Sequence, residues 1–92
     1  LGGLYLPTDG VAKAVRAVVA QLRRAQSRGV RLLEGHEVLD VTVTGGRVTG
    51  VDTDKGHIPA DVVVCCAGVW GPRIAAMVGL ELPMLPMGIS TR

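Results

Sequence analysis

Hydrophobic residues recur every three or four positions in the first third of the chain, which is the spacing of one face of an α-helix. These positions are Val11, Val15, Val18, Val19 and Leu22. The pattern predicts a helix over about residues 9–28, with Thr8 or Asp9 as its N-cap and Gly29 as its left-handed stop. A short strand is expected at residues 30–33, as half of a βαβ unit.

The middle of the chain alternates between hydrophobic and polar residues, as a half-buried strand does. Leu39, Val41 and Val43 point one way, and Gly45-Gly46 then gives a two-residue hairpin signal. A second strand is expected over residues 47–54, with Gly50 as a bulge or a point of close approach. A third, short strand follows at residues 57–58 and ends at Pro59. The pattern therefore predicts a three-stranded antiparallel β-meander.

An unbroken apolar run at residues 62–66 predicts a different kind of strand, buried on both faces within a parallel sheet. It leads into the small residues Ala67 and Gly68, and Pro72 can then start a helix over residues 73–78 that Gly79 stops. Amide groups of residues 69–71 would point outward there, in the crevice where α/β sheets bind ligands. A buried strand, turn and helix without a ligand would give the same pattern. Residues 80–87 are expected to be extended, because Pro83 and Pro86 interrupt them.

The composition fits one small domain. The chain has 92 residues, of which 48% are hydrophobic, and it begins with Leu1, which suggests a piece of a longer protein. It shows no membrane-spanning run and no secretory leader, so it is interpreted as soluble and cytoplasmic. The formal net charge is +2.

Basic residues gather on and just after the predicted helix, which carries six of the ten. With one Trp, one Tyr and no Phe there are few rings to stack on bases, so a solvated helix face is favoured over nucleic-acid binding.

Candidate chemistry is sparse. The adjacent Cys65 and Cys66 match neither a metal pattern nor a redox pair, and buried free thiols are expected. His36 and His57 are interpreted as surface loop histidines, and Met84 and Met87 as packing residues. There is no dinucleotide glycine fingerprint, phosphate-binding lysine loop or serine triad. The residues alone indicate part of an α/β ligand-binding domain, without a reaction.

The order of motifs resembles the flavin-binding domain of the D-amino-acid oxidase and sarcosine oxidase superfamily. The motifs are Arg47-Val48-Thr49-Gly50-Val51, then Gly56-x-Ile58-Pro59-Ala60-Asp61-x-Val63-Val64, then Ala67-Gly68-x-Trp70. Residues 4–87 look closest to dimethylglycine oxidases and dehydrogenases. The implied fold class is α/β, a partial FAD/NAD(P)-binding, Rossmann-like domain with the meander inserted. Residues 1–88 would belong to it, and residues 89–92 would be a tail left by truncation or cloning.

The resemblance implies FAD as cofactor and oxidation of a small secondary or tertiary amine, dimethylglycine or sarcosine-like, by hydride transfer to the flavin. It places the backbone of Val38 against the adenine, and Ala67, Gly68 and Trp70 near the pyrophosphate and the flavin ring. For Trp70, plugging the core is an equal alternative. No metal and no membrane partner are expected.

Two departures from the family pattern matter. The dinucleotide fingerprint would lie upstream, and the downstream active-site histidine is replaced by Ile89-Ser90-Thr91-Arg92. No catalytic residue is therefore expected here, and the isolated chain should be inactive and self-associate. Two alternatives stay open: a non-catalytic α/β packing or interaction module, and a piece of a pyridine-nucleotide reductase domain.

Overall fold

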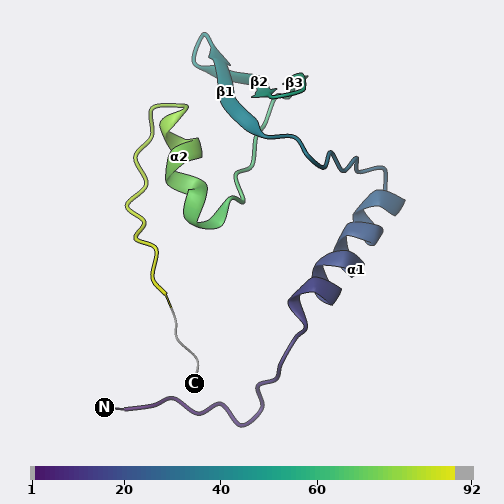
Figure 1. Ribbon diagram of the computed structural model, residues 1–92, viewed down its shortest axis with the longest axis vertical. Coiled ribbons are helices and arrows are strands. Elements are labelled where there is room, and N and C mark those ends of the chain that lie inside the picture. Colours follow the sequence, from purple (N-terminus) through teal and green to yellow (C-terminus); the bar gives the residue numbers. More distant parts are fainter. Residues whose placement is uncertain (1, 89–92) are drawn as a thin grey trace. The chain divides into compact units, whose positions relative to one another are not determined.

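The computed structural model describes residues 2–88, so the tail at residues 89–92 lies outside the described residues. The chain divides into two units, Leu1–Glu34 and Gly35–Arg92. The first unit holds α1 (Ala14–Ser27). The second holds β1 (Val38–Thr44), β2 (Arg47–Thr53), β3 (Gly56–Pro59), the 3₁₀ turn η1 (Gly68–Trp70) and α2 (Gly71–Ala76) (Figure 1).

The three-stranded meander is confirmed. Its strands lie in the order β1-β2-β3 and both pairings are antiparallel. Gly45 and Gly46 close the first hairpin with φ angles of 59° and 77°. Positive φ at both loop residues is what a two-residue hairpin turn of this hand requires, and glycine meets that requirement without strain.

Gly50 was expected at a bulge or a close approach, and it lies at both. Thr42 pairs with Gly50 and Val43 with Val48, so Thr49 is an extra residue on β2. A Cβ atom at position 50 would lie 2.3 Å from the carbonyl oxygen of Ile58. Only a residue without a side chain fits between β2 and β3 at this point.

Helix α1 begins later than the sequence predicts. Its N-cap is Lys13, which makes no side-chain cap hydrogen bond. Asp9 does not cap it, because it lies four residues before Lys13; its carboxylate accepts a hydrogen bond from the Gly10 amide at 2.8 Å instead. The C-terminal stop is confirmed: Gly29 has φ 92°, and the Val30 amide donates to the Ala25 carbonyl at 3.1 Å in a Schellman arrangement.

Two expected strands are wrong. Within residues 2–88, neither residues 30–33 nor residues 62–66 form a strand. The second run is also not buried, since Val62 is 77% exposed, Val64 78%, and both Cys65 and Cys66 are exposed free thiols. A parallel strand needs hydrogen-bonded neighbours and covered faces, and no other described segment pairs with either run.

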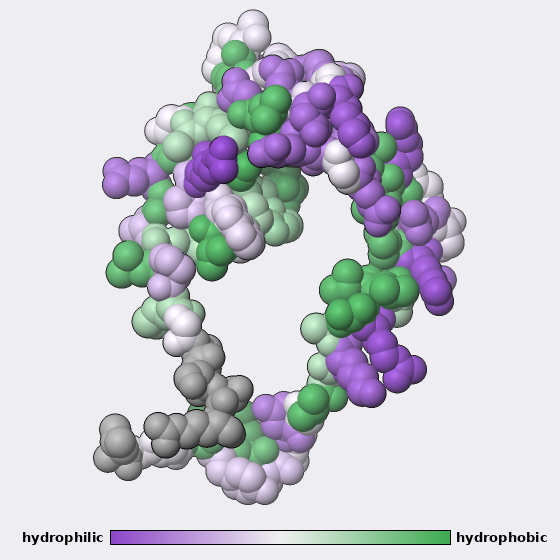
Figure 2. Space-filling view, in the orientation of Figure 1, coloured by the Kyte–Doolittle hydropathy of each residue, from purple (hydrophilic) through white to green (hydrophobic). Residues whose placement is uncertain are grey.

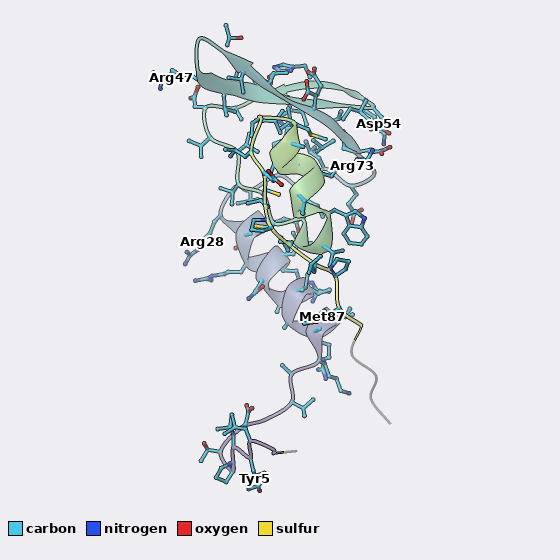
Figure 3. All side chains as sticks on the ribbon, turned by 90° about the vertical axis from the view of Figure 1, so that its left-hand side faces the viewer. Tyr5, Arg28, Arg47, Asp54, Arg73 and Met87 are labelled. Carbon is cyan, nitrogen blue, oxygen red and sulfur yellow. The ribbon has the colours of Figure 1, made fainter. Side chains whose placement is uncertain are left out.

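The second helix begins earlier than expected. Residues 68–70 form η1, α2 follows at once with Pro72 in its first turn, and Gly79 stops the segment with φ 76°. Beyond it, residues 80–87 were expected to be extended; they form no helix or strand, and the Met84 amide donates to the Leu82 carbonyl at 2.9 Å in a local turn. Met84 and Met87 lie on this arm and are 47% and 88% exposed, so the interpretation of Met87 as a packing residue is wrong for the described residues (Figure 3).

Little of the described chain is buried. Among residues 2–88, the buried hydrophobic side chain is that of Val41, with 5% of its surface exposed. Thr53 is the buried polar residue, and its hydroxyl donates to the Gly56 carbonyl at 2.8 Å. No helix within residues 2–88 is both long enough and apolar enough to cross a membrane.

Candidate cofactor-binding site

Val38 is the first residue of β1, where it pairs with Thr53. Since β1 is an edge strand of the sheet, one side of its backbone faces away from β2. Backbone amide and carbonyl groups at such an edge can bind a ring edge of a ligand without any special side chain. The structure therefore leaves Val38 in a position from which its main chain can reach a ligand.

Ala67, Gly68 and Trp70 form the turn that leads into α2. Ala67 is half-buried and precedes η1, and Gly68 has φ 55°, in the left-handed region that favours glycine. A Cβ at Gly68 would meet no atom within 4 Å, so its constraint is conformational and not steric. Trp70 is 68% exposed, and so it does not plug a core within the described residues.

The amide groups of this turn do not all point outward as predicted. The Trp70 amide donates to the Ala67 carbonyl at 3.1 Å, and the Gly71 amide donates to the Gly68 carbonyl. These two donors are used inside the 3₁₀ turn because the left-handed Gly68 folds the chain back on itself. They are unavailable to a phosphate.

Val38 and Ala67 meet at one apolar hollow of about 290 Å³, here called the Val38 hollow. Gly68 and Trp70 follow Ala67 directly but do not line it. The remaining lining residues are Val41, Val51, Val63, Val64, Cys65, Cys66 and Ile74. The structure thus brings together two of the four predicted site residues, from positions far apart in the sequence.

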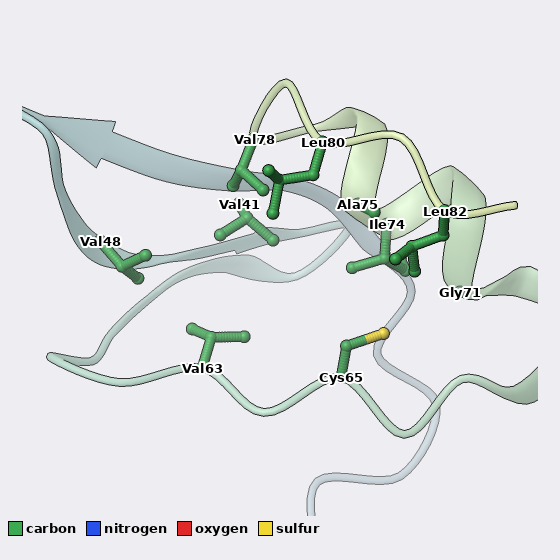
Figure 4. Close-up of a pocket in the computed structure, with 10 residues that line it drawn as sticks. All are labelled: Val41, Val48, Val63, Cys65, Gly71, Ile74, Ala75, Val78, Leu80 and Leu82. Atoms are coloured by element: carbon green, nitrogen blue, oxygen red, sulfur yellow. The ribbon is translucent and has the colours of Figure 1, made fainter.

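A second hollow of about 250 Å³ adjoins it and shares Val41, Val63, Cys65 and Ile74 (Figure 4). Leu80 and Leu82 of the extended arm line this second hollow. In the close-up, Val63 and Cys65 lie on the extended segment opposite residues of β1, α2 and the arm (Figure 4). The arm helps to close this part of the second unit.

Besides the two cysteines, five lining residues were missed as site residues by reasoning from the sequence: Val41, Val51, Val63, Val64 and Ile74. Each was read as a strand or helix residue, because apolar periodicity reports burial and carries no information about a ligand. Cys65 and Cys66 were assigned to the core and instead line the Val38 hollow. Spatial proximity is the only signal that singles these residues out.

Polar chemistry lies away from the hollow. His57 Nδ1 is 2.6 Å from Asp52 Oδ1 on the meander, and both side chains are nearly half exposed. His57 is thus a surface histidine, as predicted, but with a carboxylate partner. Among residues 2–88, no group of three or more His, Cys, Asp or Glu side chains could hold a metal ion.

The lining of the Val38 hollow decides which part of a dinucleotide could fit. It consists of valine, isoleucine, alanine and cysteine side chains and includes no charged group. Such a surface suits an uncharged planar ring and offers nothing to neutralise a pyrophosphate. The residues present therefore fit the adenine part of FAD, and the pyrophosphate would need groups from outside this hollow.

The second unit thus combines an antiparallel meander with a small apolar hollow. Comparison with known proteins shows the family. The family described as FAD dependent oxidoreductase matches residues 1–90. The chain belongs to this family, whose cofactor is FAD.

Relatives with curated functions agree with this assignment. The chain is 36% identical over 87 residues to a D-amino acid dehydrogenase of Rhizobium rhizogenes, covering 95% of this chain and 21% of the relative. It is 34% identical over 91 residues to the human mitochondrial sarcosine dehydrogenase, covering 94% of this chain and 10% of the relative. The chain thus spans about a fifth of the first relative's length and about a tenth of the second's.

A solved structure is also similar. The crystal structure of L-proline dehydrogenase from P. horikoshii matches with a TM-score of 0.76 and 36% identity. The match covers 80% of this chain and 20% of that one. The relatives act on different small amino acids by their names, so the family assignment does not by itself select a substrate.

Proposed function

We propose that this chain is part of the FAD-binding, Rossmann-like domain of an oxidoreductase that oxidises a secondary or tertiary amine, with a dimethylglycine or sarcosine-like substrate. The observation that carries the cofactor role is the Val38 hollow, which joins Val38 and Ala67 in one apolar, uncharged site. Similarity to a sarcosine dehydrogenase supports the amine substrate. The family match favours this function over a packing module or a pyridine-nucleotide reductase domain.

In this proposal each described element has a limited task. The open edge of β1 at Val38 meets the adenine through its backbone, and the hollow excludes water from the ring. Ala67 and Gly68 turn the chain sharply beside the hollow, and the exposed Trp70 faces the flavin side. When bound, FAD supplies the two-electron acceptor for a hydride. The described residues position the cofactor and supply no acid or base to the reaction.

The substrate class is tested with the full-length parent enzyme. Its flavin is reduced anaerobically with sarcosine, dimethylglycine, a D-amino acid or L-proline, and the bleaching rate of the flavin is measured. Faster bleaching by the N-methylated glycines is expected. Bleaching by the D-amino acid alone would overturn the amine assignment and leave the family assignment intact.

The cytoplasm is the proposed location. The support is chemical: Cys65 and Cys66 are free and exposed, and adjacent exposed thiols stay reduced most readily in a reducing compartment. Fractionation of source cells with an antibody to the parent checks this, and recovery from an oxidising compartment would contradict it.

A further inference from the structure

Charge is unevenly distributed along the first unit. Residues 10–33 contain six basic side chains and no acidic one. They are Lys13, Arg16, Arg23, Arg24, Arg28 and Arg31, and the nearest acids in sequence are Asp9 and Glu34. Since α1 contains no carboxylate, no ion pair within the helix can neutralise its arginines.

The basic residues share one side of α1. At about 100° per residue, Lys13, Arg16, Arg24 and Arg28 fall on the face opposite Val15, Val18 and Leu22. All four are exposed, and Arg28 projects from the end of the helix (Figure 3). Figure 2 shows hydrophilic and hydrophobic side chains side by side along α1. A partner on the basic face would leave the apolar face free to pack in a larger domain.

The basic face also has a groove. A shallow hollow of about 610 Å³ lies between Arg24 and Arg28. Its other lining residues are Ala20, Gln21, Ala25 and Val30. Val30 reaches this position because the Schellman turn folds it back, with its amide donating to the Ala25 carbonyl at 3.1 Å. The groove therefore combines two guanidinium groups with a small apolar floor.

We propose that this basic face is a docking surface for an acidic segment of a partner protein, with carboxylates flanking an apolar residue. A guanidinium presents a planar fork that binds a carboxylate through two hydrogen bonds, and five of the six basic residues are arginine. The apolar floor accommodates the residue between the carboxylates. This surface is independent of the FAD site and of the substrate.

Two other polyanions fit the face less well. A helix lying on a membrane inserts an apolar face that carries large side chains such as Trp, Phe or Leu. The apolar face of α1 holds valines and one leucine and no aromatic residue, so it offers little area to insert. Single-stranded nucleic acid needs stacking rings, and α1 contains no aromatic residue.

The test uses the 92-residue chain and a fluorescent peptide of repeating Glu-Glu-Leu units, with a Gln-Gln-Leu peptide of the same length as control. Anisotropy should show saturable binding of the acidic peptide only, weakened by added salt because exposed charges are screened. Arg24→Glu with Arg28→Glu should lower the affinity by about tenfold or more. Arg47→Glu with Arg73→Glu changes the net charge equally, outside α1, and should leave the affinity within about twofold of the unaltered chain.

Helix content is measured for every variant, and Arg24→Gln with Arg28→Gln replaces the charge-reversed pair if that pair unfolds α1. Equal loss of affinity in the Arg47 and Arg73 control would show a net-charge effect and overturn the proposal. Equal binding of the Gln peptide would also overturn it. So would tighter binding to anionic phospholipid vesicles or to a single-stranded DNA oligonucleotide than to the acidic peptide.

Discussion

At the scale of single residues, Gly50 is the position with least freedom. A Cβ there would lie 2.3 Å from the Ile58 carbonyl oxygen and 2.9 Å from the His57 ring. Gly50→Ala must push β3 away from β2, which we expect to cost about 1–3 kcal/mol of unfolding free energy. Urea unfolding followed by circular dichroism measures it. Gly10→Ala is the matched control, since a Cβ there meets nothing within 4 Å. Equal midpoints for the two variants would contradict the prediction.

Gly68 differs from Gly50, because its surroundings are open and its backbone is left-handed, with φ 55°. In the full-length parent, Gly68→Val should strain the turn beside the Val38 hollow by about 1–2 kcal/mol and lower FAD occupancy far more than helix content. Flavin absorbance per protein and far-ultraviolet circular dichroism measure the two effects.

Asparagine tolerates the left-handed region better than valine, so Gly68→Asn serves as the control and should keep most of the cofactor. If Gly68→Val loses fold and flavin in parallel, the turn is structural and has no special relation to the cofactor.

His57 contacts one of two acidic residues that lie opposite each other on the meander. Asp40 and Asp52 are cross-strand partners, and like charges directly opposite each other destabilise a sheet. His57 lies 2.6 Å from Asp52, so His57→Ala should lower the unfolding free energy by up to about 1 kcal/mol, a small effect because both groups are half exposed. His57→Gln, which keeps a hydrogen-bond donor, should restore part of the lost unfolding free energy, measured by urea unfolding. A fully stable His57→Ala variant would show that the pair contributes nothing.

At the scale of elements, the sequence was sufficient where the determining interactions are local. The Gly45-Gly46 turn fixes the first hairpin, and the stops at Gly29 and Gly79 depend only on neighbouring backbone groups. The meander and the C-terminal ends of the two helical segments could therefore be predicted. The start of α1 could not, because Thr8 and Asp9 offered a capping side chain and the helix begins instead after Lys13, which makes no side-chain cap hydrogen bond.

The strands predicted at residues 30–33 and 62–66 are wrong because a parallel strand depends on interactions distant in the sequence. Their β-branched, apolar composition is a requirement for a buried parallel strand, but the strand forms only when partner strands are present. No described segment supplies them. The same applies to the predicted burial of Cys65 and Cys66, which line an open hollow instead.

The candidate site shows a similar division. The resemblance gave Val38, Ala67, Gly68 and Trp70, and the structure brings the first two to one hollow. Periodicity alone could not have placed Val38 and Ala67 at the same hollow, because their proximity depends on how the meander and the segment of residues 62–67 pack. Their role toward FAD stays a prediction.

At the scale of the whole molecule, the chain should not bind FAD tightly by itself. The Val38 hollow is uncharged and about 290 Å³ in volume, so it can receive a ring but cannot hold the pyrophosphate. The backbone amides that bind a pyrophosphate normally come from a glycine-rich turn and a helix N-terminus, and this sequence contains no such glycine fingerprint. Titration of the chain with FAD, followed by flavin fluorescence, should show no saturable quenching below about 1 μM. Tight saturable binding would contradict the prediction.

We propose that the isolated chain self-associates through residues 62–66. This run is rich in β-branched residues, pairs with no described strand and exposes most of Val62 and Val64. Exposed apolar strand edges pair with whatever is available, here a second copy of the same run or the extended arm of residues 80–87 exchanged between copies. The alternative is a monomer in which the arm closes over its own chain.

Sedimentation over a wide concentration range separates these two outcomes. We expect the mass to rise with concentration, and mild oxidation to trap a disulfide between copies at Cys65 or Cys66, because pairing along the run brings these thiols together. Val64→Lys places a charge on the pairing edge and should keep the chain monomeric, whereas Val69→Lys, at an exposed position outside the run, should not. A constant monomer mass with a cooperative melt would instead favour the arm closing the gap within one chain.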